Sequence, residues 1–190
     1  MSRLNRTGPN FRQIILQEIK KIKPKKVLQL GCVQGLFSLP IAQALFGYGE
    51  LTVVDVSPNA LEITKNKVAG WDNVISKQIN AEDTGFPKES FDTVILYFLL
   101  HEVSKEAKTN IIHEACRVLK KDGTLFLADY HKAKKSVITS VLEKFINMIE
   151  PYSGELMRMD LVKALFKNGV RVKKQLFGNL GLTQLIIAKK

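Results

Sequence analysis

Apolar and polar residues follow two distinct patterns along the chain, which predict strands and helices in turn. Short apolar runs end at a glycine or an acidic residue, and several precede longer stretches with apolar residues every three or four positions. The strands expected from these runs are 26–30, 51–54, 74–79, 91–98, 124–128, 170–177 and 182–188. The expected helices are 36–46, 58–69, 105–120, 136–149 and 160–167. This alternation is typical of βαβ units, so we expect a doubly wound α/β fold around a mostly parallel, seven-stranded sheet.

Local signals mark several ends of these elements. Ser57 is a natural N-cap with Pro58 at the first helical position, and Asp160 can cap the last helix, after which Gly169 fits the C-cap. The loop 178–181, Gly-Asn-Leu-Gly, is short enough to join the last two strands as a hairpin. The sheet is therefore predicted to close with a C-terminal antiparallel hairpin.

The length of 190 residues, 45% of them hydrophobic, allows one sizeable core, so we expect a single domain over residues 1–190. No apolar run approaches the roughly 20 residues that span a bilayer, and residues 1–26 lack the apolar stretch of a secretory signal. The expected location is the cytoplasm. Cys32 and Cys116 are too few for a disulfide framework and lack metal-ligand spacing, so both are expected to pack as small residues.

The formal net charge of +11 predicts a surface that attracts an anionic partner, such as nucleic acid, an acidic lipid face or a charged cofactor. The basic residues lack interleaved aromatics at the spacing of a nucleic-acid module, and a solvated basic face with no partner is the alternative. The basic clusters are Lys20, Lys21, Lys23, Lys25 and Lys26; Lys132, Lys134 and Lys135; and Arg171, Lys173 and Lys174.

Candidate ligand-binding residues follow the first three predicted strands, because open α/β sheets bind ligands at the carboxyl ends of their strands. The turn 31–35, Gly-Cys-Val-Gln-Gly, lets the backbone bend sharply and approach a ligand. Asp55 ends the second strand, twenty residues past Gly35, where a carboxylate can accept both hydroxyls of a ribose. Residues 80–82 follow the third strand, where an adenine ring would lie. Together they predict a nucleotide-like cofactor.

Five polar or ionisable residues follow the fourth and fifth strands, where a substrate would meet the reactive end of that cofactor. A histidine can act as a base near neutral pH, and carboxylates can hold a hard metal or orient a hydroxyl. The alternative for each is a structural cap or packing role. The candidate catalytic residues are His101, Glu102, Asp129, Tyr130 and His131.

With these positions in hand, residues 26–190 resemble the class I S-adenosylmethionine-dependent methyltransferases. Residues 27–35 resemble motif I of that family, 52–57 its ribose-binding strand and 80–83 its adenine-side turn. Residues 91–94 and 115–123 resemble the motif before the fourth strand and the helix-turn before the fifth.

The resemblance implies both a division of the chain and a set of binding residues. Residues 1–25 would hold an N-terminal helix, 26–130 the cofactor-binding core, and 131–190 substrate-side helices and the hairpin. The implied S-adenosylmethionine-binding residues are Gln29, Gly31, Cys32, Gly35, Asp55, Val56, Asn80, Ala81, Glu82 and Tyr97. Two positions depart from the family pattern, which usually has an acidic residue at Gln29 and a glycine at Val33.

A narrower resemblance covers these departures. The segments 28–35, 97–103, 129–131, 150–152 and 177–180 resemble the rhodoquinone-biosynthesis proteins. That resemblance implies use of S-adenosylmethionine as an amino donor to a membrane quinone, with a divalent metal such as manganese. The candidate metal ligands are Asp129 and His131.

The predicted function is S-adenosylmethionine-dependent transfer to a small aromatic or quinone-type acceptor, with His101 or His131 as the base. The alternatives are metal-dependent amino transfer to a membrane quinone and, because of the charge, RNA methylation. Against RNA methylation, the fourth strand ends in Leu-Tyr-Phe-Leu and lacks an Asn/Asp-Pro-Pro-Tyr arrangement. A dinucleotide oxidoreductase is disfavoured by the glycine spacing, whereas a degenerate binding module would account for Gln29 and Val33.

The predicted helix 136–149 carries a broad apolar face that includes Val137, Val141, Phe145 and Met148. Such a stripe is most often core. Because Lys132, Lys134 and Lys135 precede it, the alternative is a lid or interfacial helix in peripheral contact with an anionic membrane.

Overall fold

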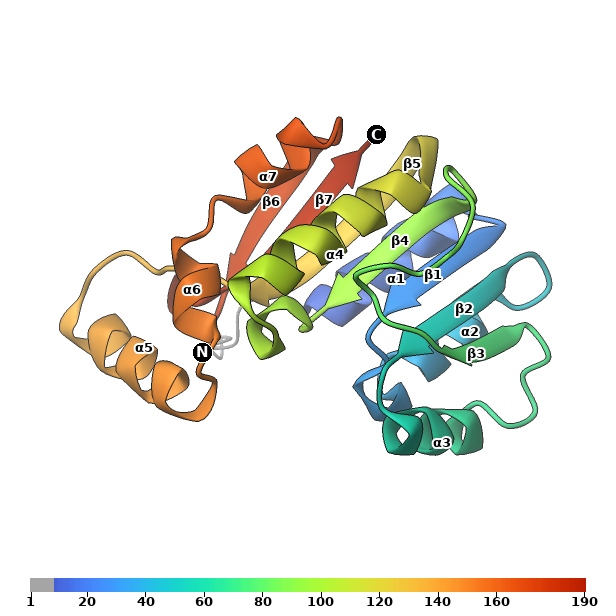
Figure 1. Ribbon diagram of the computed structural model, residues 1–190, viewed down its shortest axis with the longest axis horizontal. Coiled ribbons are helices and arrows are strands. Elements are labelled where there is room, and N and C mark those ends of the chain that lie inside the picture. The colour runs from blue at the N-terminus through green and yellow to red at the C-terminus, as the bar shows by residue number, and fades with distance from the viewer. Residues whose placement is uncertain (1–8) are drawn as a thin grey trace, which may run out of the picture.

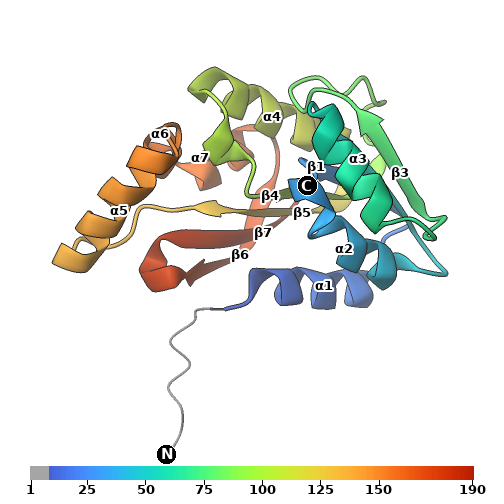
Figure 2. The same cartoon turned by 90° about the horizontal axis from the view of Figure 1, so that it is seen from below.

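A seven-stranded sheet lies between two layers of helices in the computed structural model, which describes residues 9–190 (Figures 1 and 2). The strands are β1 (Lys26–Leu30), β2 (Glu50–Asp55), β3 (Val74–Gln78), β4 (Phe91–Tyr97), β5 (Leu119–Tyr130), β6 (Arg171–Gly178) and β7 (Thr183–Lys189). Their order in the sheet is β3-β2-β1-β4-β5-β7-β6. Strands β1 to β5 pair in parallel, and β7 pairs antiparallel with both β5 and β6. The predicted doubly wound fold and its C-terminal hairpin are confirmed.

The helices cover both faces of this sheet. They are α1 (Phe11–Ile22), α2 (Ser38–Leu45), α3 (Pro58–Lys67), α4 (Lys105–Val118), α5 (Val137–Ile149), α6 (Ser153–Arg158) and α7 (Leu161–Lys167), with short 3-10 turns η1 (Val33–Gly35), η2 (Leu100–Glu102) and η3 (Asn179–Gly181). One core forms where α1 and α2 pack on the sheet, and the other where α4, α6 and α7 pack on its opposite face. Within residues 9–190, no helix is long and apolar enough to cross a bilayer.

The central strand β4 shows why its sequence is nearly all apolar. Val94 and Leu96 belong to the core under α4 and α7, whereas Ile95 and Tyr97 belong to the core under α1 and α2. Because alternate side chains point to opposite faces, a strand covered on both sides buries all of them.

Two predicted helix starts are confirmed by their caps. The Ser57 hydroxyl accepts a hydrogen bond from the Ala60 amide at 3.2 Å, and the Asp160 carboxylate accepts one from the Lys163 amide at 2.9 Å. These contacts satisfy amides that have no partner inside the helix.

The boundary between α4 and β5 differs from the sequence prediction. The helix ends at Val118 and the strand begins at Leu119, which pairs with Phe91, rather than at residue 124. The register then shifts, and a Cβ on Gly123 would lie 2.7 Å from the Leu119 side chain. The glycine therefore serves a close approach within an irregular strand and does not mark the end of the helix.

The helix α6 was not predicted at all. It has six residues, Ser153–Arg158, between Pro151 and Asp160. A helix this short makes less than two turns, so its sequence shows no clear helical period.

Candidate functional site

A cavity of about 400 Å³ opens at the carboxyl ends of β1, β2 and β3 and is bounded by η2 and α4. This volume lies within the roughly 300–1,000 Å³ typical of small-molecule sites. Six residues that the sequence assigned to the cofactor line it: Gly31, Asp55, Val56, Asn80, Ala81 and Glu82. Apolar walls that the sequence analysis missed come from Val54, Ile79, Leu99, Val103 and Ile111. A pocket with apolar walls and a few polar groups fits an adenosyl ligand.

The turn after β1 brings the backbone against Leu99, in the segment that follows β4. Gly31 has a φ of +79°, and a Cβ built on it would lie 3.1 Å from Leu99 Cδ1. The Gly31 amide also donates to the Val54 carbonyl at 2.9 Å. A side chain at this position would be strained and would narrow the cavity, which accounts for the glycine.

Asp55 connects this turn to the start of α3. Its Oδ2 accepts a hydrogen bond from the Cys32 amide and its Oδ1 accepts one from the Ser57 amide, both at 2.9 Å. Each carboxylate oxygen can accept more than one hydrogen bond, so capacity remains for hydroxyl groups in the cavity. The carboxylate thus has the position and the chemistry to bind a ribose.

The turn after β3 is held by its own side chains. Asn80 Oδ1 accepts from the Glu82 amide at 3.0 Å, and Glu82 Oε2 accepts from Asn110 Nδ2 of α4 at 2.9 Å. These contacts fix the cavity wall formed by residues 80–82.

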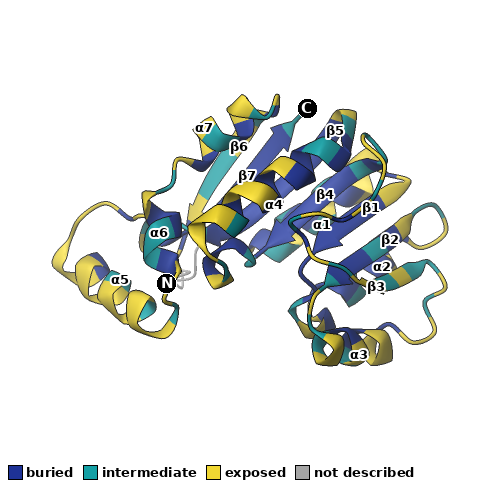
Figure 3. Cartoon of the chain, viewed as in Figure 1, coloured by how far each residue is buried: buried dark blue, intermediate teal, exposed yellow. Residues whose placement is uncertain are grey.

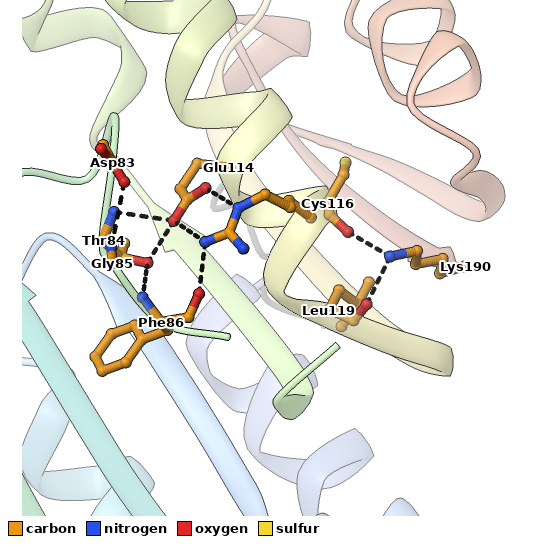
Figure 4. A network of polar contacts seen from close by, with 9 residues as sticks. Asp83, Thr84, Gly85, Phe86, Glu114, Cys116, Leu119 and Lys190 are labelled. Atoms are coloured by element: carbon orange, nitrogen blue, oxygen red, sulfur yellow. Dashed lines mark hydrogen bonds and ion pairs between the residues drawn. The ribbon is translucent and has the colours of Figure 1, made fainter. Parts of the chain in front are cut away.

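A buried carboxylate that the sequence analysis missed fastens the same loop to α4 (Figure 4). Glu114 accepts hydrogen bonds from the amide of Thr84, at 2.9 Å, and from its hydroxyl. Arg117 Nε lies 2.6 Å from Glu114 Oε2, and the same guanidinium donates to the Phe86 carbonyl. Burial opposes the charge of Glu114, but Arg117 and Thr84 outweigh it and lower its pKa to about 2. Thr84 and Glu114 lie 30 residues apart in the chain, so no local sequence motif indicates their contact.

Four residues assigned to the cofactor, Gln29, Cys32, Gly35 and Tyr97, do not line this cavity. Gln29 is fully buried, donates from Nε2 to the Gly31 carbonyl at 2.9 Å and accepts from the Ser38 hydroxyl at 2.8 Å. A carboxylate could not donate to that carbonyl, so the amide has its own structural role beneath the turn.

Packing explains the places of Gly35 and Tyr97. A Cβ on Gly35 would lie 3.0 Å from Thr64 Cα, so the glycine lets η1 pack closely against α3. Tyr97 packs on the ring of Phe37 at 4.7 Å, on the face of the sheet opposite α4, and its hydroxyl accepts from Arg12 Nε at 3.3 Å.

Position 33, where the family usually has a glycine, carries backbone strain in this chain. Val33 has a φ of +44° and Gln34 one of +50°, both in the left-handed region. A β-branched residue rarely adopts this conformation, so the backbone at Val33 is strained. Beside it, Cys32 is buried, and burial raises the pKa of its thiol above the ordinary value, which fits a packing role.

Four of the five candidate catalytic residues come together next to the cavity. Asp129 is only 1% exposed, and its carboxylate accepts hydrogen bonds from the Leu100 and Tyr130 amides. Its Oδ1 also lies 2.8 Å from His101 Nδ1. The Tyr130 ring packs on the His101 ring at 4.8 Å. Glu102 lines the cavity, and its Oε1 is 3.9 Å from His101 Nε2.

The charge on His101 is controlled by these neighbours. Burial of the ring opposes protonation, but the hydrogen bond and charge of Asp129, with smaller contributions from Glu102 and Glu150, raise the pKa of His101 above its usual value. Because Asp129 occupies Nδ1, the Nε2 atom is the one left to exchange a proton.

His131 is not part of this group. Its Nδ1 lies 2.9 Å from the Gly181 carbonyl, and its ring packs on Phe177 at 4.7 Å, so it contacts the β6–β7 hairpin. Across residues 9–190, no three His, Cys, Asp or Glu side chains gather where they could hold a metal ion. The Asp129 oxygens accept from or face three donors, and His131 Nδ1 faces the Gly181 carbonyl, so a metal site at Asp129 and His131 stays a prediction.

Sequence comparisons show which known proteins the chain is similar to. The sequence model of a family described as "Methyltransferase domain" matches residues 27–123. The ubiquinone/menaquinone biosynthesis C-methyltransferase of Francisella philomiragia is 28% identical over 141 residues, covering 73% of this chain and 56% of that protein. The demethylmenaquinone methyltransferase of Staphylococcus aureus is 27% identical over 146 residues, covering 77% of this chain and 60% of that protein. The chain thus spans less than two thirds of the length of these curated relatives.

Solved structures share the fold. The methyltransferase domain of bacterial CtHen1 superposes with a TM-score of 0.73 at 16% identity and covers 94% of this chain and 97% of that chain. A SAM-dependent methyltransferase from Aquifex aeolicus superposes with a TM-score of 0.64 at 18% identity, covering 91% and 88%. At these identities the likeness concerns the fold alone.

Proposed function

Since this chain belongs to the methyltransferase domain family, we propose that it is an S-adenosylmethionine-dependent enzyme that methylates a small aromatic or quinone-type acceptor, with His101 as the base. The observation that carries the proposal is the buried His101–Asp129 pair, whose neighbour Glu102 lines the cofactor cavity. The class of acceptor is supported by the two curated relatives, whose names refer to ubiquinone and menaquinone. Aromatic rings beside His101, those of Phe98 and Tyr130, suit a flat acceptor.

We assign cofactor binding to the part of the cavity at the carboxyl ends of β1, β2 and β3. The Asp55 carboxylate would accept the ribose hydroxyls, and the turn 80–82 would border the adenine. Bound S-adenosylmethionine supplies an electrophilic methyl group. The remaining chemistry is positioning and removal of one proton from the acceptor.

His101 and Asp129 divide that proton transfer between them. An ionised Asp129 accepts a hydrogen bond from Nδ1–H and so favours the tautomer in which Nε2 is unprotonated and basic. When Nε2 takes a proton from the acceptor, the Asp129 carboxylate stabilises the resulting imidazolium. This is the role that an aspartate plays behind a catalytic histidine in other enzymes.

Methyl transfer is tested by incubating the protein with S-adenosylmethionine that carries a deuterated methyl group, together with benzoquinols and naphthoquinols. Mass spectrometry should show an acceptor that gains the labelled methyl group, together with S-adenosylhomocysteine. His101→Asn keeps an N–H toward Asp129 but removes the base, so the rate should fall by about 10²- to 10⁴-fold. His113→Asn, on the exposed side of α4, is the matched control and should retain the rate.

Two outcomes would contradict the proposal. An acceptor that gains an amino group instead of the label would establish amino transfer in place of methylation. A folded His101→Asn variant with an unchanged rate would show that His101 is not the base.

A further inference from the structure

The helix α5 lies beyond the end of the sheet, and most of its residues are exposed (Figures 1 and 3). Val137 is 82% exposed and Met148 is 72% exposed. The other exposed apolar side chains of this face are Ile138, Val141, Leu142, Phe145 and Ile149. An apolar face of this size is uncommon on a water-soluble surface unless a partner covers it.

The orientation of α5 is the reverse of that of α1. The helix α1 buries Phe11, Ile15 and Ile19 against the sheet, as an amphipathic surface helix normally does. In α5 the buried side chain is Thr139, and the half-buried ones include Glu143. The apolar face of α5 is therefore the outer one.

Specific contacts hold α5 in this orientation. The Thr139 hydroxyl donates to the Lys134 carbonyl at 2.9 Å and belongs to a capping box with Ser136. Glu143 Oε1 accepts from the Ala133 amide at 3.2 Å. The side of α5 that carries Thr139 and Glu143 is thus bonded to the preceding segment, and the apolar side faces solvent.

The charges around this face indicate the chemistry of the partner. Lys132, Lys134 and Lys135 precede the helix, Lys144 lies on it, and all four are exposed. The acidic residues of the same element, Glu143 and the following Glu150, are half-buried. An apolar helical face flanked by exposed lysines is the pattern of a helix that lies in the interface of an anionic bilayer.

We propose that α5 docks this protein onto an anionic membrane surface, with the apolar face 137–149 in the bilayer interface and Lys132, Lys134 and Lys135 on the headgroups. The inference goes beyond the proposed methyl transfer, and docking does not depend on it.

The helix α5 leads through Glu150 into α6, which packs against η2, the turn that carries His101. Glu150, the residue after α5, is close enough for its charge to contribute to the raised pKa values of His101 and Tyr130. The following helix α6 is fastened by the fully buried Lys108, whose Nζ lies 3.7 Å from Glu155 Oε2 and 5.4 Å from the centre of the Tyr152 ring. Docking therefore brings the candidate catalytic residues to the membrane surface, where an acceptor with an apolar tail would be held. This last step rests on the proposed function.

The test is flotation with vesicles of phosphatidylcholine alone and of phosphatidylcholine mixed with phosphatidylglycerol. The protein should bind the mixed vesicles, and added salt should release it. The double variant Val141→Asp and Phe145→Asp should lose at least about tenfold in partitioning, as should the triple variant Lys132→Glu, Lys134→Glu and Lys135→Glu. Matched controls are Val162→Asp with Phe166→Asp on α7, and Lys65→Glu with Lys88→Glu and Lys121→Glu, all at exposed positions. Both controls should bind like the wild type.

A second measurement reports on α5 itself and on folding. In a Phe145→Trp variant that also carries Trp71→Phe, so that its one tryptophan lies on α5, the emission should shift to the blue on mixed vesicles and be quenched by brominated lipid. Each variant should still bind S-adenosylhomocysteine, because the cofactor cavity contains no residue of α5.

Three results would overturn the docking proposal: no binding to either vesicle, equal binding to both, or a dimer in vesicle-free buffer that the Val141→Asp and Phe145→Asp variant dissociates. The dimer would show that a second copy of the chain covers the face. Vesicle binding without methylation of any quinol would reject the proposed function and leave docking intact, and methylation without vesicle binding would do the reverse.

Discussion

The proposed cofactor side and the proposed acceptor side of this protein are built by different kinds of contact. On the cofactor side, hydrogen bonds between carboxylates and backbone amides fix each turn: the half-buried Asp55 holds the turn after β1, and the buried Glu114 holds the loop after β3. On the acceptor side, the side-chain hydrogen bonds that α5 makes within residues 9–190 go to the adjacent segments, and the helix turns apolar residues outward. The contrast agrees with our proposals that the cofactor is bound from water and that the acceptor is held by a membrane.

The largest expected effect comes from breaking the cofactor side at Glu114. Its pKa in the folded protein is about 2, against an ordinary value of 4.5, so its charge contributes on the order of 3 kcal/mol to folding. Because the folded pKa is depressed, this stability is present above the ordinary pKa and is lost as the pH falls toward 2. Glu114→Gln should therefore lower the free energy of unfolding by a similar amount at neutral pH, and the difference from wild type should shrink in acid.

Urea unfolding at neutral and acidic pH measures this difference. Glu106→Gln, at an exposed position in the first turn of the same helix, is the control and should cost less than about 1 kcal/mol. Equal losses in the two variants, or a Glu114→Gln deficit that does not change with pH, would show that the Glu114 charge does not hold the loop.

A smaller effect, on binding, is expected at Asp55. Asp55→Ala removes an acceptor from the cavity and from the Cys32 and Ser57 amides. Loss of a charge-assisted hydrogen bond costs about 1.5–3 kcal/mol, so affinity for S-adenosylhomocysteine should fall by about one to two decades. Isothermal calorimetry measures the change, with Asp72→Ala at an exposed site as the control. An unchanged dissociation constant in a folded variant would exclude Asp55 from the binding site.

The fold, and the cavity residues Gly31 and Asp55, could be predicted from the sequence because local sequence signals indicate both. Strand ends, the Ser57 and Asp160 caps, and the glycine at position 31 are determined by neighbouring residues. The carboxyl ends of parallel strands lie at the same edge of a sheet, so Gly31 and Asp55, at the ends of neighbouring strands, are expected to lie close together.

The rest depends on contacts that no local pattern records. Glu114 reaches Thr84 from another element, and Tyr97 has the residue type of a binding group but faces the opposite core. His131 follows Asp129 by two residues, yet its side chain meets the hairpin tip, because that hairpin folds beside the end of β5. The outward face of α5 was also ambiguous, since an apolar stripe has the same period whether a core or a membrane covers it.

The smallest expected effect is a shift in pH dependence on the acceptor side, at Asp129. Its carboxylate raises the pKa of His101, so the neutral, basic form of His101 should appear only as the pH rises through this raised value. Asp129→Asn removes the negative charge while keeping the shape, and the pKa of His101 should fall. The acidic limb of kcat/KM for methyl transfer should therefore move to lower pH, while the maximal rate drops because the imidazolium is less stabilised. Stability should change in the matching sense: the contribution of charged His101, present below its ordinary pKa and lost as the pH rises through the folded pKa, should diminish in the variant.

Glu102→Gln, which removes a more exposed charge, should shift the acidic limb of kcat/KM in the same direction by less. A limb that stays in place or moves to higher pH in a folded Asp129→Asn variant would show that this carboxylate does not control the base.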